Sequence, residues 1–238
     1  PAGTQNLGSV AADFSIIASN AEILDLDLAT VTTAATDGFT VTSTSTGAIT
    51  GSDGADTITN TSGSATIIGG AAADAITGGT GTDIIKYAST TAALMAVEAG
   101  SAVGSGNTAG TIATFTSGTD KLHFSSSLVN NNIDTDTLKV IVKGGTVAAN
   151  DTFVHVSNTA IGDAVGTIAG AVTIANALIT STVAQNEDII IAMDDDTNTY
   201  LWLLTQLSTA DTVAAQDLTL IGTLTGITTV TNGDFVSF

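Results

Sequence analysis

The sequence predicts an all-β protein in which a parallel β-solenoid is followed by a β-sandwich-like C-terminal region with one or two short helices. Three observations support this fold class. A nine-residue repeat runs without gaps through residues 51–86, short β-branched runs bounded by Gly and Asp precede it, and long apolar runs lie near the C-terminus. With 238 residues, the chain is long enough to bury a sizeable core.

The charge of the chain is strongly unbalanced. Hydrophobic residues make up 43% of the sequence and charged residues 11%, which argues against a disordered acidic tail. The 23 Asp and Glu residues outnumber the four basic residues, so the formal net charge is −19. Such a surface repels nucleic acid and anionic membranes, whereas divalent cations that bridge carboxylates relieve its self-repulsion. Cysteine is absent, so packing, backbone hydrogen bonds and bound metal have to supply the stability.

The repeat is the most informative feature. Its four units are GSDGADTIT (51–59), NTSGSATII (60–68), GGAAADAIT (69–77) and GGTGTDIIK (78–86). The eighth position is Ile in every unit, and the sixth position is Asp in the first, third and fourth units. A unit of this length fits a tight turn followed by a three-residue strand whose central residue points inward, so two units make one coil. Turns that are 18 residues apart therefore stack on the same flank at the strand spacing of about 4.8 Å.

The stacked turns offer oxygen ligands for a cation. Asp56 stacks on Asp74 on one flank, and Ala65 stacks on Asp83 on the other. Glycines at positions one, two and four allow positive φ and aim carbonyl oxygens inward, and calcium prefers six or more oxygen ligands at roughly 2.3–2.6 Å. We expect the flank with two carboxylates to bind Ca²⁺ well, and the flank with one to bind it weakly or not at all. The predicted metal-binding residues of the repeat are Gly51, Asp53, Gly54, Asp56, Gly70, Ala72, Asp74, Gly79, Gly81 and Asp83.

These units resemble the RTX repeats, with consensus GGxGxDxUx and U a large aliphatic residue, of bacterial proteins exported by type I secretion. Unit two departs from the consensus at positions one, two and six. Downstream, residues 112–126 (IATFTSGTDKLHFSS) resemble the motif that closes many RTX β-rolls, which implies Asp120 as the ion ligand there. The resemblance implies an RTX calcium β-roll with its closing motif over residues 51–126, Ca²⁺ as the cofactor, and secretion to the outside of a bacterial cell. A Gly-rich loop that happens to carry three Asp residues is the alternative, but it does not explain the isoleucines.

The regions beside the repeat are expected to continue it. Residues 1–50 carry short β-branched runs, which we interpret as degenerate solenoid coils continuing from a part N-terminal to this sequence. Within them, residues 20–28 (NAEILDLDL) resemble strands of the calcium-dependent surface-layer proteins of Gram-negative bacteria. Residues 89–102 (STTAALMAVEAGSA) have a Ser start, apolar spacing near 3.6 and a Gly stop, which predict a helix at one end of the β-roll.

Residues 127–238 are predicted to form a β-rich C-terminal domain. Three segments read as strands, and they resemble the closing strands and uncleaved secretion signal of type I substrates: 197–204 (TNTYLWLL), 217–226 (DLTLIGTLTG) and 232–238 (NGDFVSF). The first of these is apolar on both faces, as in a sandwich core. The acidic residues just before it favour a solvated hairpin turn over a calcium loop, because Thr199 and Thr205 stand where a calcium loop needs Gly and Glu.

No membrane span is expected. The uncharged run 164–186 is long enough to be considered, but Gly, Asn and Thr interrupt it and acidic residues flank it without a basic anchor. A buried helix or a pair of strands is the better interpretation.

No catalytic residues are expected, and we predict that the chain is not an enzyme. The two histidines, His123 and His155, lie in strand-like runs without a partner at a metal-ligand spacing. Neither a GxSxG motif nor a phosphate-binding Walker loop is present.

The sequence therefore predicts a structural bacterial cell-surface (S-layer) protein fragment that is exported unfolded and then folds and assembles in extracellular calcium. The expected partners are further copies in a surface lattice, the type I secretion machinery and, through an N-terminal part outside this sequence, cell-surface polysaccharide. Nucleic acid is not an expected partner. The alternative is the C-terminal secretion and folding module of an RTX exoenzyme such as a serralysin-like protease, or of an adhesin.

Overall fold

The computed structural model describes residues 15–18, 26–28, 38–44, 46–89, 95, 109–128, 139–142, 153–157, 164–178, 188–205 and 212–238. Within these residues the protein is mostly β-strand, as predicted for an all-β chain. Its strands form a ten-stranded and a six-stranded sheet. The helical elements include α2 (Ile168–Leu178) and a short 3-10 helix, η1 (Ala215–Asp217).

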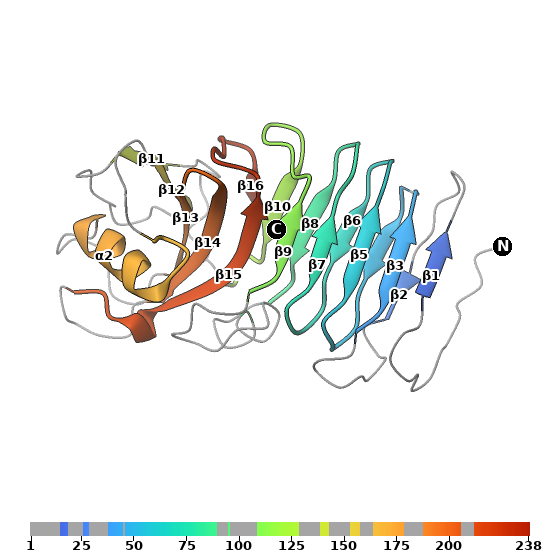
Figure 1. Cartoon of the computed structure of the whole chain (residues 1–238), viewed down its shortest axis with the longest axis horizontal. Coiled ribbons are helices and arrows are strands. Elements are labelled where there is room, and N and C mark those ends of the chain that lie inside the picture. Colours follow the sequence, from blue (N-terminus) through green and yellow to red (C-terminus); the bar gives the residue numbers. More distant parts are fainter. Residues whose placement is uncertain are drawn as a thin grey trace.

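The first ten strands alternate between the two sheets along the chain (Figure 1). The odd-numbered strands lie in the ten-stranded sheet: β1 (Ser15–Ala18), β3 (Thr40–Ser43), β5 (Thr57–Asn60), β7 (Ala75–Thr77) and β9 (Thr111–Ala113). The even-numbered strands lie in the six-stranded sheet: β2 (Leu26–Asp27), β4 (Ala48–Thr50), β6 (Thr66–Ile68), β8 (Ile84–Tyr87) and β10 (Lys121–Phe124). Neighbouring strands of this series pair in parallel within each sheet.

The isoleucine at the eighth position of each repeat unit sets the register of these strands. Ile58 pairs with Ile76 in the larger sheet, and Ile67 pairs with Ile85 in the smaller one. All four side chains are buried. The inward orientation predicted from the sequence is thus confirmed, and alternate residues of each short strand face outward.

The C-terminal strands extend the same two sheets. The ten-stranded sheet continues from β9 through strands taken from the second half of the chain: β15 (Leu218–Thr225), β14 (Asn198–Thr205), β13 (Asp188–Asp194), β12 (Phe153–Ser157) and β11 (Lys139–Val142). β13, β14 and β15 pair antiparallel, whereas β15 lies parallel to β9. The last strand, β16 (Phe235–Ser237), joins the six-stranded sheet beside β10. The three segments predicted as C-terminal strands are all strands.

Two hydrophobic clusters hold the structure together. The first contains buried residues of both sheets, from Leu28 to Phe235, and includes Leu201 and Leu203 of β14. The second contains the residues that alternate with these, such as Trp202, together with one face of α2. The prediction that β14 is apolar on both faces is therefore confirmed. Figure 1 shows α2 beside the C-terminal strands, at the end of the molecule opposite β1.

The uncharged run over residues 164–186 contains a buried helix rather than a pair of strands. α2 buries Ala171, Ile174, Ala175 and Leu178. Among the described helices, none is long and apolar enough to cross a membrane. Apart from residues 89 and 95, the helix predicted over 89–102 lies outside the described part of the chain.

Candidate cation site in the repeat turns

Four aspartates of the repeat and its closing motif are buried in the turns. Asp56, Asp74, Asp83 and Asp120 each stand directly before a strand, and each is at most 6% exposed. Carboxylates are buried in proteins only where hydrogen bonds or cations compensate their lost hydration. The partners of these eight oxygens therefore decide what the turns can bind.

One oxygen of each aspartate joins its turn to the neighbouring coil. The N–H of Asp56 donates to Oδ1 of Asp74, and the N–H of Ala65 donates to Oδ1 of Asp83, both at 2.8 Å. The stacking predicted on each flank is thus observed. The second flank continues, because the N–H of Asp83 donates to Oδ1 of Asp120 at 2.8 Å. The sequence placed Asp120 in the closing motif but gave no sign that it lies over Asp83.

The second carboxylate oxygen of Asp83 has no hydrogen-bond partner, although the residue is only 1% exposed. A second unpartnered oxygen, Oδ1 of the fully buried Asn60, belongs to unit two on the neighbouring coil. The amide nitrogen of Asn60 donates to the carbonyl of Gly63 at 3.0 Å and to Oδ1 of Asp83 at 3.3 Å. Two buried oxygens without donors thus lie on neighbouring side chains. A buried acceptor without a hydrogen-bond donor costs about 1–3 kcal/mol, so the space next to these two oxygens favours a cation.

The backbone explains why Asp83 lacks a donor from its own turn. Gly79 has φ +77, and its N–H donates to Oγ1 of Thr114 at 2.8 Å. A Cβ on Gly79 would lie 2.0 Å from the carbonyl oxygen of Asn60, and one on Gly81 would lie 2.3 Å from that of Gly63. The carbonyl oxygens of unit two therefore pack directly against the two glycines of unit four, and a residue with a Cβ would clash there.

The turn of unit one differs, because its aspartate is fully hydrogen-bonded. Oδ2 of Asp56 accepts the backbone N–H of Ser52 at 2.6 Å. Gly51 lies so close that a Cβ there would stand 2.4 Å from the same oxygen. Gly54 donates its N–H to Oγ of Ser52 at 3.2 Å, and Asp53 is half-buried beside them. Ser52 carried no signal in the sequence beyond standing where the consensus has Gly.

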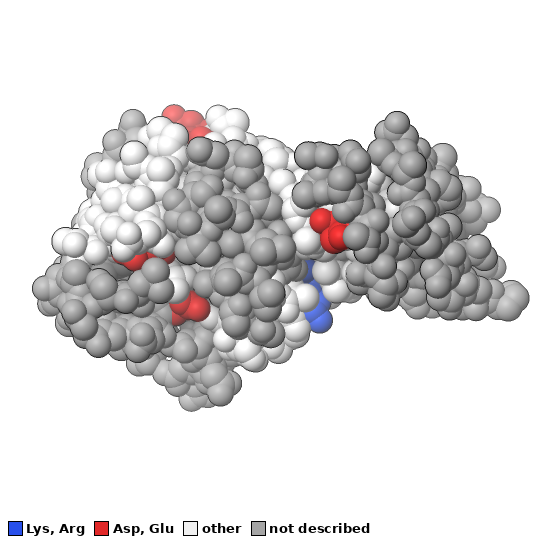
Figure 2. All heavy atoms as spheres, turned by 90° about the horizontal axis from the view of Figure 1, so that it is seen from below, with Lys and Arg blue, Asp and Glu red and all other residues white. Residues whose placement is uncertain are grey.

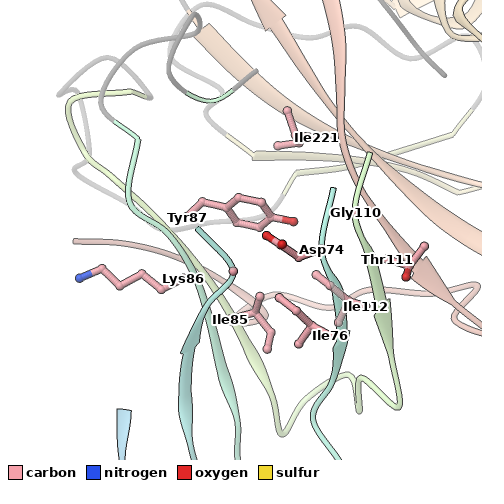
Figure 3. A pocket seen from close by; sticks show the side chains of 10 residues that line it. Asp74, Ile76, Ile85, Lys86, Tyr87, Gly110, Thr111, Ile112 and Ile221 are labelled. Atoms are coloured by element: carbon pink, nitrogen blue, oxygen red, sulfur yellow. The ribbon is translucent and has the colours of Figure 1, made fainter. Parts of the chain in front are cut away.

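The turn of unit three lies beside a small cavity. Gly70 has φ +108 and Ala72 has φ +71, so both take the left-handed conformation expected of the turn. The cavity, of about 20 Å³, is lined in part by Asp74, Tyr87 and Ile221. In Figure 3 the Tyr87 ring and the Asp74 carboxylate point toward each other across it. Its volume suits a water molecule and is too small for an organic ligand.

Burial raises the pKa of the Asp56 and Asp83 carboxyls above the ordinary value. Desolvation is the main cause for both. Hydrogen bonds from Ala65 and Asn60 oppose the rise at Asp83, whereas the negative charge of Asp120 adds to it. A nearby cation would act in the opposite direction and stabilise the ionised form.

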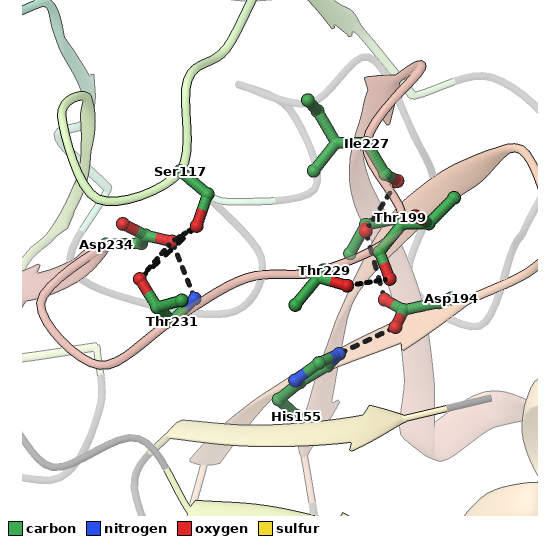
Figure 4. A network of polar contacts seen from close by, with 9 residues as sticks. Ser117, His155, Asp194, Thr199, Ile227, Thr229, Thr231 and Asp234 are labelled. Carbon is green, nitrogen blue, oxygen red and sulfur yellow. Dashed lines mark hydrogen bonds and ion pairs between the residues drawn. The ribbon is translucent and has the colours of Figure 1, made fainter. Parts of the chain in front are cut away.

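Asp234 closes the C-terminal end of the described structure without needing an ion. It is fully buried, and it accepts Oγ–H of Ser117 at 2.6 Å and the N–H of Thr231 at 2.7 Å (Figure 4). It also accepts the N–H of Gly118 at 2.7 Å. Both of its oxygens are satisfied by the protein. No local motif predicted this role, because Ser117 and Gly118 lie more than a hundred residues from Asp234 in the sequence.

A second buried polar cluster lies among the C-terminal strands. Nε2 of His155 lies 2.7 Å from Oδ2 of Asp194, and Oγ1–H of Thr199 donates to Oδ1 at 3.0 Å (Figure 4). His155 lies in β12, in agreement with its interpretation as a strand residue. Its Nδ1 has no partner. No hydroxyl is hydrogen-bonded to this imidazole in the described network, so it lacks the arrangement of an activated nucleophile.

In the part of the chain that the structure describes, no three His, Cys, Asp or Glu side chains gather as a metal-binding group. A cation at the repeat turns would therefore depend on amide and carbonyl oxygens as well as on carboxylates. Comparisons with protein-family models, with curated proteins and with solved structures found no match to this chain.

Proposed function

We propose that this chain is a structural bacterial cell-surface protein whose repeat is an RTX-type calcium β-roll, continued as a parallel β-solenoid. The observation that carries the proposal is the pair of unpartnered buried oxygens, Oδ1 of Asn60 and Oδ2 of Asp83. These atoms, with carbonyl oxygens of the stacked turns, are hard ligands of the kind that Ca²⁺ prefers. Mg²⁺ suits such a site less well, because it demands stricter geometry and keeps its waters.

The proposed mechanism is folding coupled to metal binding. A chain with net charge −19 repels itself, and burying the aspartates of the turns adds a desolvation cost. Bound Ca²⁺ neutralises this charge and so stabilises the folded turns. One site occupied at 100 times its dissociation constant contributes about 2.7 kcal/mol. With the millimolar affinities of extracellular modules, the chain would fold outside the cell and not in the cytosol.

The surface of the larger sheet supports a structural role. β3, β5, β7 and β9 have the sequences TVTS, TITN, AIT and TIA, which contain no charged residue. Such a face can approach a neighbouring molecule without desolvating charges. Many of the described carboxylates are buried, and the view from below shows only scattered charged groups among the described residues (Figure 2).

The test compares urea unfolding, followed by circular dichroism, in excess EGTA and in millimolar CaCl₂. We expect the midpoint to rise strongly with Ca²⁺ and little with the same concentration of MgCl₂. Identical unfolding curves in EGTA and Ca²⁺ would exclude calcium-coupled folding.

Lattice formation is tested separately, by electron microscopy and light scattering of the folded protein at high concentration. The structural role predicts ordered oligomers or sheets that dissolve in EGTA. A calcium-stabilised protein that stays monomeric would instead support the secretion and folding module of an exoenzyme or adhesin.

A further inference from the structure

The repeat contains two kinds of turn, which differ at the second position of the unit. In units three and four this position is Gly70 or Gly79, and both have positive φ. In unit one it is Ser52, whose φ is not positive. A serine resists positive φ because of its Cβ, so its peptide keeps another orientation.

Ser52 saturates the carboxylate of Asp56. Its N–H donates to Oδ2 at 2.6 Å, and its Oγ lies 3.1 Å from both carboxylate oxygens. Phe39 of the preceding coil donates its N–H to Oδ1 at 2.5 Å. Ser52 is itself only 2% exposed. Three protein donors thus converge on Asp56, and each carboxylate oxygen already accepts a backbone N–H.

Asp83 shows the opposite situation at a Gly-Gly turn. Its own turn supplies no donor to Oδ2, because the N–H of Gly79 is turned toward Thr114. At these two turns, Ser52 supplies its aspartate with donors that Gly79 does not supply to Asp83.

We propose that Ser52 replaces a calcium ion at the Asp56 turn and thereby confines metal binding to the Gly-Gly turns. This inference rests on the proposed calcium function and reverses the order expected from counting carboxylates. The flank with two aspartates contains one that needs no ion, whereas the flank with one aspartate contains the unmet oxygens. The first coil of the repeat would then close without calcium and present a formed strand to the coils that follow.

The test is a gain of binding. In the 238-residue chain, S52G restores the Gly-Gly pair, so that position 52 can turn its N–H away from Asp56 as Gly79 turns its N–H away from Asp83. We expect isothermal titration with CaCl₂ to give one more ion per chain than the wild type. We also expect the variant to unfold at lower urea than the wild type in EGTA, because Asp56 loses its internal donors.

Two control variants isolate the cause. S64G makes the same substitution in the neighbouring turn, where the Ser64 hydroxyl accepts the N–H of Thr82. S52A removes the hydroxyl of Ser52 but keeps a Cβ, so the backbone N–H stays on Asp56. Both should bind the same number of ions as the wild type.

The outcomes separate this inference from the proposed function. Calcium binding by the wild type with no additional ion in S52G, or with an equal gain in S64G, would overturn the role of Ser52 alone. No calcium binding by the wild type would overturn the proposed function. If S52G fails to fold, D56N in the wild-type background decides: an unchanged ion count supports the inference, and the loss of an ion overturns it.

Discussion

Replacing Asp83 by Asn should have opposite effects on stability without and with calcium. In the metal-free protein, Oδ2 of Asp83 is a buried carboxylate oxygen without a donor, and burial raises the pKa of this group. Asn is neutral, keeps an oxygen for the N–H groups of Ala65 and Asn60, and replaces the unpartnered Oδ2 by an amide nitrogen. A buried acceptor without a donor usually costs about 1–3 kcal/mol. Removing it should therefore stabilise the metal-free protein by about 1 kcal/mol, the lower end of that range.

With calcium the sign should reverse, because the site loses its charged ligand. A tenfold weaker dissociation constant removes about 1.4 kcal/mol of linked stability, so D83N should become less stable than the wild type. The assay is urea unfolding in EGTA and in saturating CaCl₂, with equal m-values as the condition for comparing midpoints. D56N is the matched control: its new amide nitrogen would face the N–H of either Ser52 or Phe39, so it should be destabilised in both conditions. Equal destabilisation of D83N in both buffers would refute the assignment of Asp83 as the metal-binding carboxylate.

Three further predictions concern strain, pH and the C-terminal closure. Ala72 has φ +71, a conformation that costs an L-residue about 1–2 kcal/mol. A72G should therefore raise the urea midpoint, but only slightly, because Gly loses more backbone entropy on folding. G63A places alanine at φ +85 in the equivalent position of unit two and should lower the midpoint. Burial raises the pKa of Asp188 to about 6, so its protonated form stabilises the fold below about pH 4 and this contribution is lost as the pH rises through 6. D188N should therefore flatten the decline in stability between pH 4 and 7, measured in EGTA, and an unchanged slope would assign that decline to other groups. D234A should leave the buried N–H groups of Gly118 and Thr231 without acceptors and cost about 3 kcal/mol, seen as faster hydrogen exchange around Gly118 than in β4.

The repeat could be predicted from the sequence because its information is local and periodic. An isoleucine every nine residues fixes which residue of each strand is buried, as Ile58 and Ile67 show. Two units per coil then fix which turns stack, so the position of Asp74 beside Asp56 followed directly. The strand at 197–204 was equally clear, since its unbroken apolar pattern needs cover on both faces.

The partners of distant segments could not be predicted in the same way. Thr223 of β15 pairs with Thr111 of β9, and Phe235 of β16 pairs with Leu122 of β10, but no local pattern specifies which strand edge a later strand joins. Residue type alone also could not predict which oxygens of the turns would lack a hydrogen-bond partner. Asn60 counted only as a departure from the consensus, although its buried side-chain oxygen has no partner.

The position of β15 and β16 has a consequence for how the protein reaches its folded state. These two strands cover the edges of β9 and β10, which would otherwise expose unpaired backbone and recruit a strand from another molecule. The contacts that close those edges join segments more than a hundred residues apart, and such contacts form slowly because a long loop has to close first. Until β15 and β16 have paired, both edges therefore remain open to a strand from another molecule.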